Sequence, residues 1–285
     1  MHRRTLFGIC LGASLLRAQV PEEFNLPPEA REVAPAAGDA AWRFRVGAML
    51  LAGPKVPGSE EGRVIPLPVL SAEYRDTLVL GSSRIGVGAG AAVHLVKTRS
   101  FTWDLGLGLG ERRRESRADE LAGMGDRQAG LWAGTALRGR WGGFGTSLSW
   151  AAALQDSAGQ RATLSVGYGG RLAPRWLGSV AISATWANAD AMATEFGVSP
   201  EQAAARSALI LAGDPRLRPG EDRAYAPQGG LRDTALTAML TYLPVRSWRW
   251  FTLGRVEALG SEVKASPLVR RGTDARLGVG FSYAF

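Results

Sequence analysis

Cysteine is almost absent from this sequence, which has one such residue, Cys10, among 285. Cys10 lies in the apolar segment near the N-terminus, so a chain that loses this segment has no thiol at all. Such a chain can have neither a disulfide framework nor a thiolate metal site. Lysine is scarce as well, because Lys55, Lys97 and Lys264 are the only ones and arginine supplies the remaining basic charge.

Long apolar runs are missing beyond the N-terminal segment, where no stretch approaches the roughly 18 residues that a membrane-spanning helix needs. This absence excludes a helical membrane protein. The mean hydropathy is close to zero, as expected if apolar and polar residues alternate along every strand of a transmembrane barrel.

The charge balance is basic, with 34 Lys and Arg residues against 26 Asp and Glu residues. Such a balance could indicate nucleic-acid binding. However, the arginines are scattered singly along strand-like segments and do not gather with aromatic residues on a helix. We therefore predict no nucleic-acid partner and assign these charges to the lumen and rims of a barrel.

The first residues have the pattern of an export signal. Residues 2–4 are His-Arg-Arg, and residues 5–16 are almost entirely apolar. This run is too short to span a bilayer and has the length of a signal-peptide core. Cleavage after Ala18 fits best, although Leu16 is a poor match at the −3 position. The alternative is a buried helix at the start of a soluble domain.

The rest of the chain divides into two parts. Residues 19–40 are rich in Pro, Ala and Glu and show no period, which predicts a flexible periplasmic leader. From residue 41 onward, alternation of apolar and polar residues returns as far as the C-terminus. We therefore predict a signal peptide at 1–18, a leader at 19–40 and an outer-membrane β-barrel at 41–285.

The alternation is clearest in the last strand, which ends at Phe285. One face carries Leu277, Val279, Phe281, Tyr283 and Phe285, and the other carries Arg276, Gly278, Gly280, Ser282 and Ala284. A soluble β-sandwich would also alternate. Here the polar faces are largely Gly, Ser, Thr and Ala, which suits a crowded lumen, and Trp and Tyr recur near strand ends as interfacial girdles require. The first face is expected to direct insertion into the membrane.

Twelve antiparallel strands can be counted in an up-and-down barrel. They are expected near residues 41–52, 62–74, 77–81, 84–95, 99–110, 128–139, 142–154, 161–173, 176–188, 230–243, 248–259 and 273–285. Short and long joints alternate, as in bacterial barrels with short periplasmic turns and long outer loops. Ten strands is the alternative if residues 77–95 are not divided. One helix is predicted in the loop at 188–229, where Ser199-Pro200 and Gln202 form a capping signature and the helix runs to about Leu211.

Chemistry-bearing groups are few. His94, the one histidine left after processing, is expected to be a structural residue near the periplasmic rim, because no serine motif accompanies it. Alternating glycines at 86–90 and 106–110 lack the helix of a nucleotide-binding turn. The mixed charges of residues 111–127 could hold a divalent cation or lipopolysaccharide phosphates, but a solvated loop of compensating charges is the favoured interpretation. We predict no catalytic residue, cofactor or metal.

Five charged residues are expected to point into the lumen, where they could line a pore or pair and plug it: Arg43, Arg45, Asp104, Arg138 and Glu257. At twelve strands or fewer, side chains can fill most of the lumen, so a wide general porin is not expected.

Several motifs resemble those of the MipA/OmpV family of outer-membrane proteins. They are Gly53–Ser59 with Gly58 and Ser59, Pro66-Leu-Pro68 with Tyr74, Leu121–Asp126, Phe196-Gly197-Val198-Ser199 with Ser207, and Ser266-Pro267-Leu268-Val269. The resemblance covers residues 41–285. Ala265 stands where the family usually has Asp, and residues 209–222 look like an insertion.

The resemblance implies a barrel without established catalysis in the bacterial outer membrane, in contact with lipid and lipopolysaccharide. It also implies a scaffold for a murein-degrading lytic transglycosylase and a murein-synthesising penicillin-binding protein. The alternatives are a narrow porin-like channel or a surface adhesion protein, and, resting on His94 alone, a lipid-modifying enzyme.

Overall fold

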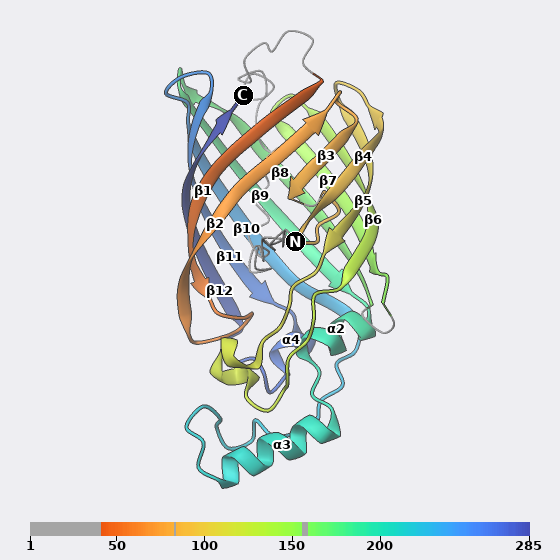
Figure 1. Cartoon of the computed structure of the whole chain (residues 1–285), viewed down its shortest axis with the longest axis vertical. Coiled ribbons are helices and arrows are strands. Elements are labelled where there is room, and N and C mark those ends of the chain that lie inside the picture. Colours follow the sequence, from red (N-terminus) through yellow and green to blue (C-terminus); the bar gives the residue numbers. More distant parts are fainter. Residues whose placement is uncertain (1–40, 83, 156–158) are drawn as a thin grey trace, which may run out of the picture.

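Twelve antiparallel strands close into one barrel (Figure 1). The computed structural model describes residues 41–82, 84–155 and 159–285. The signal peptide and leader predicted at residues 1–40 lie outside the described residues. The strands are β1 (Trp42–Pro54), β2 (Gly62–Tyr74), β3 (Leu78–Ser82), β4 (Ala89–Lys97), β5 (Phe101–Leu109), β6 (Leu131–Trp141), β7 (Phe144–Ala153), β8 (Gln160–Ala173), β9 (Trp176–Ala187), β10 (Gly230–Tyr242), β11 (Trp248–Leu259) and β12 (Thr273–Ala284).

The two ends of the barrel differ, as the sequence predicted. One end, here called the short-turn end, carries the brief connections at 75–77, 98–100, 142–143, 174–175 and 243–247, and Phe285. The other, the long-loop end, carries the connections at 55–61, 110–130, 188–229 and 260–272. The prediction of twelve strands and not ten is confirmed.

One predicted strand begins late. Residues 84–88 were expected within a strand, but β4 starts at Ala89 and these residues turn inward. Gly86 and Gly88 have φ values of 82° and 55°, which a strand residue does not adopt. Ile85 and Val87 pack against Trp132 in the barrel interior. The alternating glycines mark a fold of the chain into the lumen.

The seam between the first and last strands closes the sheet. β1 pairs with β12 from Arg45 opposite Ala284 to Ala52 opposite Leu277. Phe44 and Phe285 exchange both backbone hydrogen bonds, each 3.0 Å, and their rings stack 5.7 Å apart. A Cβ atom on Gly47 would lie 2.0 Å from the carbonyl oxygen of Phe281, so this register requires glycine there. Closure satisfies both sheet edges, which a membrane demands.

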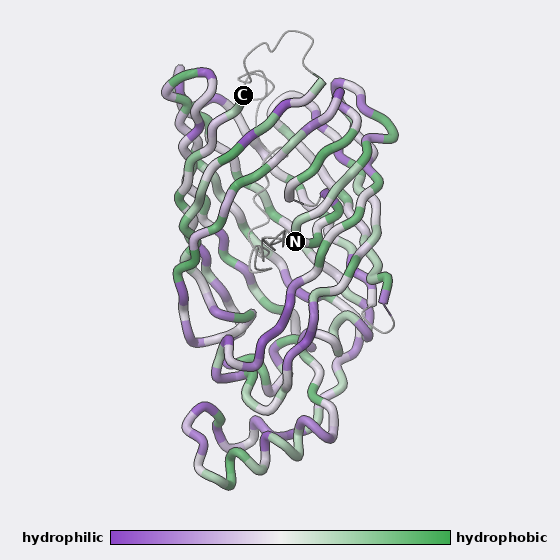
Figure 2. The backbone as a smooth tube through the Cα atoms, viewed as in Figure 1, coloured by the Kyte–Doolittle hydropathy of each residue, from purple (hydrophilic) through white to green (hydrophobic). Residues whose placement is uncertain are grey.

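Apolar side chains cover the outside of the barrel. Leu50 is 53 % exposed, Ile182 65 % and Leu277 60 %, and comparable residues recur on every long strand. Figure 2 shows hydrophobic residues along the barrel wall and hydrophilic residues concentrated in the loops. An apolar outer surface of this extent is unfavourable in water and is suited to contact with the lipid of a membrane.

Inward-facing side chains differ between the two halves of the wall. Two apolar clusters lie inside the barrel, one on β1, β2 and β11 and one on β9, β10 and β11: Met49, Leu51, Leu67, Val69 and Phe251, and then Leu177, Met239 and Leu253. The inner faces of β5 to β8 carry mostly Gly, Ala, Ser and Thr. Bulky residues on one side and small ones on the other narrow the lumen without filling it evenly.

Three helices belong to the long loops: α2 (Ala189–Phe196), α3 (Pro200–Leu211) and α4 (Ser261–Lys264), with 3-10 turns η1 (Glu115–Arg117) and η2 (Asp119–Leu121). The predicted helix is α3, and its capping box is present, with Ser199 accepting from the backbone N–H of Gln202 and Gln202 bonding back to Ser199. The helix α2 was not predicted from the sequence. Among the described helices, none combines the length and the apolar character needed to cross a membrane.

Candidate functional site

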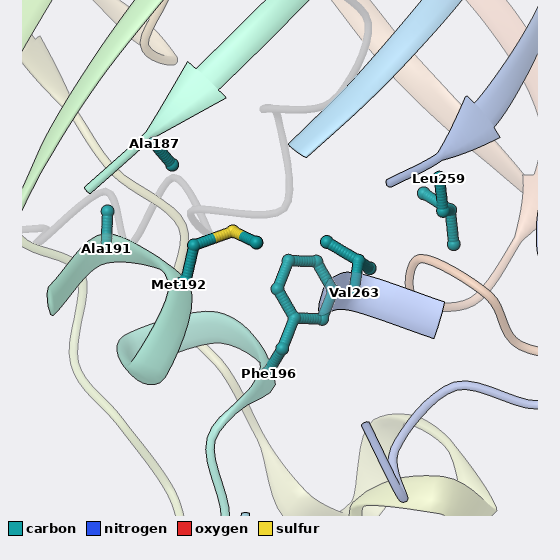
Figure 3. Packing of buried hydrophobic residues seen from close by; sticks show 6 residues of the cluster. All are labelled: Ala187, Ala191, Met192, Phe196, Leu259 and Val263. Atoms are coloured by element: carbon teal, nitrogen blue, oxygen red, sulfur yellow. The ribbon is translucent and has the colours of Figure 1, made fainter. Parts of the chain in front are cut away.

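The long loops fold over the barrel mouth as one unit, here called the loop cap (residues 55–61, 110–130, 188–229 and 260–272). Figure 3 shows the apolar cluster that fixes it to the rim. Met192 and Phe196 of α2 and Val263 of α4 meet Ala187 and Leu259, where β9 and β11 end. All are buried. Two connections far apart in sequence thereby anchor to the same edge of the barrel.

A second apolar cluster holds the outer part of the loop cap. It joins Met124, Val198, Ala203 and Leu268, with Tyr225 packed beside them. Val198 and Tyr225 pair through two backbone hydrogen bonds of 2.9 Å, and the Tyr225 hydroxyl donates to the backbone oxygen of Glu262 at 2.7 Å. Three of the four loops therefore share one small core.

Glu120 links three of the loops, although its side chain is fully buried, at 0 % exposed. Its Oε1 accepts from the Ser59 hydroxyl at 2.9 Å and from the Glu60 backbone N–H at 3.2 Å. Arg270 lies 3.6 Å away. A buried carboxylate requires such partners. The expectation that residues 111–127 form a solvated loop of compensating charges is therefore wrong for this part, because Glu120 and Leu121 are in the interior.

Arg206 of α3 is the second fully buried charge of the loop cap. It donates to the backbone oxygens of Glu221, Glu120 and Ala122 at 2.7 to 2.9 Å. Glu221 in turn accepts from Arg270 at 2.7 and 2.8 Å. Burial acts to raise the pKa of Glu221, but the hydrogen bonds from Arg270 and the backbone of Arg218 hold it below its ordinary value. The loop cap therefore has a charged core as well as an apolar one.

Most family-motif residues lie in the loop cap, whereas Gly53 lies near the end of β1 and Pro66, Pro68 and Tyr74 lie on β2. Gly58, with φ 73°, donates its N–H to the Asp274 carboxylate at 3.1 Å, and Ser59 bonds to Glu120. The Ser266 hydroxyl donates to the Phe196 backbone oxygen at 2.6 Å. The others are Gly197, Val198, Ser199 and Pro267. The structure brings these motifs together, which the sequence did not predict.

A cavity of about 440 Å³, here called the chamber, lies between the loop cap and the barrel interior. Its barrel-side wall is a group of ion-paired side chains on β8, β10, β11 and β12, here called the ladder. Glu195 of α2 bonds to Arg161 and Arg232. Glu257 lies 2.6 Å from Arg276 and 3.3 Å from Arg255. The loop cap is thus joined by ion pairs to the inside of the barrel.

The five predicted lumen charges do not form one site. Asp104 and Arg138 are ion-paired on the wall formed by β5 and β6. Glu257 lies in the ladder near the long-loop end. Arg43 pairs with Glu73 and Asp76 at the short-turn end. Arg45 pairs in register with Ser71 and Ala284 near the same end.

His94 lies on β4 near the short-turn end, where its backbone N–H donates to the oxygen of Thr77 in the 75–77 turn at 2.8 Å. Its ring is buried, with Nδ1 2.5 Å from the Asp104 carboxylate. Its Nε2 has no hydrogen-bond partner among the described residues. The part of the chain that the structure describes also holds no cluster of three or more His, Cys, Asp or Glu suited to a metal ion.

The closed barrel of twelve antiparallel strands with an apolar outer surface is that of a bacterial outer-membrane protein. A family model described as MltA-interacting protein MipA matches residues 46–285. The chain therefore belongs to the MipA family, as its motifs predicted. A search of curated proteins finds no match.

Solved structures with similar architecture include outer-membrane proteins and porins. OmpT of Vibrio cholerae is 8 % identical, with a TM-score of 0.37, and the match covers 88 % of this chain and all of that one. The NanC porin is 9 % identical, with a TM-score of 0.38, over 85 % of this chain and 99 % of that one. The KdgM porin in complex with disordered oligogalacturonate is 9 % identical, with a TM-score of 0.36, over 86 % and 98 %. These values are too low to transfer an activity.

Proposed function

We propose that this protein is a non-enzymatic scaffold of the outer membrane whose short-turn end holds murein enzymes. The family description, an interacting protein, supports this. Short turns of bacterial barrels face the periplasm, where murein lies. Interlocked loops cover the opposite end, so the partner surface would be the short-turn end.

The observation that carries the proposal is the charge of that end. Exposed arginines occupy four of the five short turns, at Arg75, Arg99, Arg175 and Arg246, and Arg171 lies beside them. The acids at this end, Glu73 near the end of β2 and Asp76 in the 75–77 turn, already pair with Arg43 and Lys97. The surplus suits a partner with an acidic face, since complementary charge guides protein association.

The test is capture of a purified lytic transglycosylase, and separately of a penicillin-binding protein, by the purified barrel in detergent. Reversing Arg99, Arg175 and Arg246 to Glu should weaken binding about tenfold or more. A matched variant reverses Arg114, Arg218 and Arg271, which are exposed at the long-loop end, and should bind normally. A third variant lacks residues 19–40, the proposed leader. Absence of capture by the wild-type barrel would refute the scaffold, and capture that survives both the turn reversal and the leader deletion would refute the short-turn end as the partner surface.

A narrow channel is the second candidate, because the chamber leaves about 440 Å³ of open volume inside the mouth. Planar-bilayer recordings separate the two. The scaffold predicts silence, whereas stable current steps that shift when Arg45 is replaced by Glu would establish a pore. The scaffold also predicts that His94→Ala leaves the acylation of lipopolysaccharide unchanged in mass spectra.

A further inference from the structure

The chamber has an excess of positive charge on its loop side. Eight arginines and four carboxylates line it. Arg232, Arg255 and Arg276 are neutralised within the ladder described above. Nearer the loop cap, the lining has five arginines and two carboxylates, Glu111 and Glu195, and Asp126 lies 3.9 Å from Arg112. The five are Arg112, Arg113, Arg117, Arg127 and Arg161. The surplus is therefore local to one side of the cavity.

Arg113 and Arg127 are the centre of this surplus. Their backbones pair across the 110–130 loop through hydrogen bonds of 2.9 and 2.8 Å. The two residues are therefore directly opposite each other, with their side chains on the same side of the paired backbones. Among the described residues, neither has a carboxylate within 4.0 Å. Like charges in directly opposed positions destabilise a pair of strands, and burial together with Arg127 lowers the pKa of Arg113 to about 10. An anion between them would relieve this repulsion.

Several hydrogen-bond donors of the arginines on the loop side of the chamber are also unsatisfied. The Nε atoms of Arg112, Arg113 and Arg161 are buried without a hydrogen-bond partner among the described residues. Arg127 donates to the Thr194 backbone oxygen, and Arg113 reaches the Met124 backbone oxygen only at 3.4 Å. Buried donors are normally satisfied, and a guanidinium offers a planar pair of donors that matches carboxylate or phosphate.

The rest of the lining suits a hydroxylated carbon skeleton. Ser149, Thr163, Thr185, Gln128 and Gln155 supply hydroxyl and amide groups on one side of the chamber. Ile85 and Val87, on the inward fold of residues 84–88, supply an apolar face. The volume lies within the range of small-molecule sites.

We propose that the chamber binds a small hydroxylated organic anion, a sugar acid or sugar phosphate, whose charged group is held by Arg113 and Arg127. This site is separate from the short-turn end, so it stands or fails independently of the scaffold.

The test is calorimetric titration of the full-length barrel, purified in zwitterionic detergent, with glucuronate, glucose 6-phosphate and glucose. The two anions should bind, more weakly as salt is raised, and neutral glucose should not. Arg113→Gln and Arg127→Gln should each raise Kd about ten- to hundredfold, since each removes hydrogen bonds to a charged group. Arg113→Lys, which keeps the charge but not the planar donor pair, should fall between wild type and Arg113→Gln.

The control is Arg218→Gln, an exposed arginine of the loop cap outside the chamber, which should leave Kd unchanged. Retention of heat-dependent mobility in gels shows that each variant is folded. Binding of glucose as tightly as the acids, failure of both acids at millimolar concentration, or wild-type affinity in both glutamine variants would overturn the site. Binding of lipopolysaccharide alone would also overturn it, because the ligand would then be a lipid and not a solute.

Discussion

The two ends of this barrel differ in how the strands are connected and in how far their ion pairs are buried. At the short-turn end the chain reverses within a few residues, and its ion pairs lie in water, with Arg43 43 % and Asp76 58 % exposed. At the long-loop end four connections build an interior of their own, with Arg206 and Glu120 at 0 %. Exposed ion pairs contribute little to stability, whereas a buried charge that loses its partner is costly. The short-turn end should therefore tolerate charge changes that the loop cap does not.

Disrupting the pairing of β1 with β12 should have the largest effect on the amount of folded protein, because the whole barrel depends on this closure. Deleting Phe285 removes two backbone hydrogen bonds and the ring stacked on Phe44, which leaves unpaired edge in the membrane. We expect little or no folded protein in outer-membrane fractions, measured by heat-dependent gel mobility. Leu211→Ala, a change at an exposed residue of α3, serves as the control. Normal insertion of the deletion variant would show that the seam does not depend on its last residue.

Arg206→Ala should open the loop cap and leave the barrel intact. The change removes three hydrogen bonds to buried backbone oxygens, at a cost of about 3–5 kcal/mol by analogy with broken buried ion pairs. Hydrogen exchange of residues 200–211, followed by mass spectrometry, should accelerate strongly, while exchange in β1 and β12 stays unchanged. Arg218→Ala, whose pair with Glu60 is exposed, should not alter it. Equal protection in Arg206→Ala and wild type would mean that apolar contacts alone hold the loop cap.

Acid should loosen the loop cap. The folded state holds the pKa of Glu221 below its ordinary value of 4.5. A lowered pKa contributes stability that is present above this value and is lost as the pH falls through the folded value. Exchange of residues 200–211, corrected for its intrinsic pH dependence, should therefore rise below about pH 4.5. Glu221→Gln should flatten the profile, and a profile unchanged by this substitution would assign the effect to another acid.

The smallest effect is expected for Arg43→Ala at the short-turn end. Its pairs with Glu73 and Asp76 are partly exposed, so the free energy of unfolding should fall by less than about 1 kcal/mol and the difference should shrink in high salt. Urea unfolding of the detergent-solubilised or lipid-inserted barrel measures it. A loss as large as that from Arg206→Ala would erase the contrast between the two ends.

The barrel could be predicted because each strand and each short turn is marked by the residues of its own segment. Alternation along each segment fixes which side chains face lipid, and short joints fix which strands pair. Residues 84–88 were wrongly predicted as part of a strand because glycines spaced by two occur in strands and in turns alike. The helix α2 had a usable signal that was overlooked, Asn188, whose side chain accepts from the Ala191 N–H at 3.0 Å as an N-cap.

The loop cap was not predictable, because its contacts join distant segments. Ser59 and Glu120, or Arg206 and Ala122, carry no mark in the sequence that pairs them. The mixed charges of the 110–130 loop resembled a solvated surface, since composition does not say which charges will be buried. The same limit applies to the chamber, whose arginines come from the 110–130 loop and from β8, β10, β11 and β12.

The aromatic side chains beside the seam form a continuous series of ring contacts from Tyr74 through Trp42, Phe44, Phe285, Tyr283 and Trp248 to Phe281 and Trp250. Almost the whole chain separates Phe44 from Phe285, so their meeting carries the greatest loop-closure entropy in the molecule. Coupling between the rings of Trp42 and Phe44 on one strand and those on β12 can arise only once the cylinder is shut. Near-ultraviolet circular dichroism of the unlabelled protein should therefore time the final step of assembly separately from the earlier formation of strands.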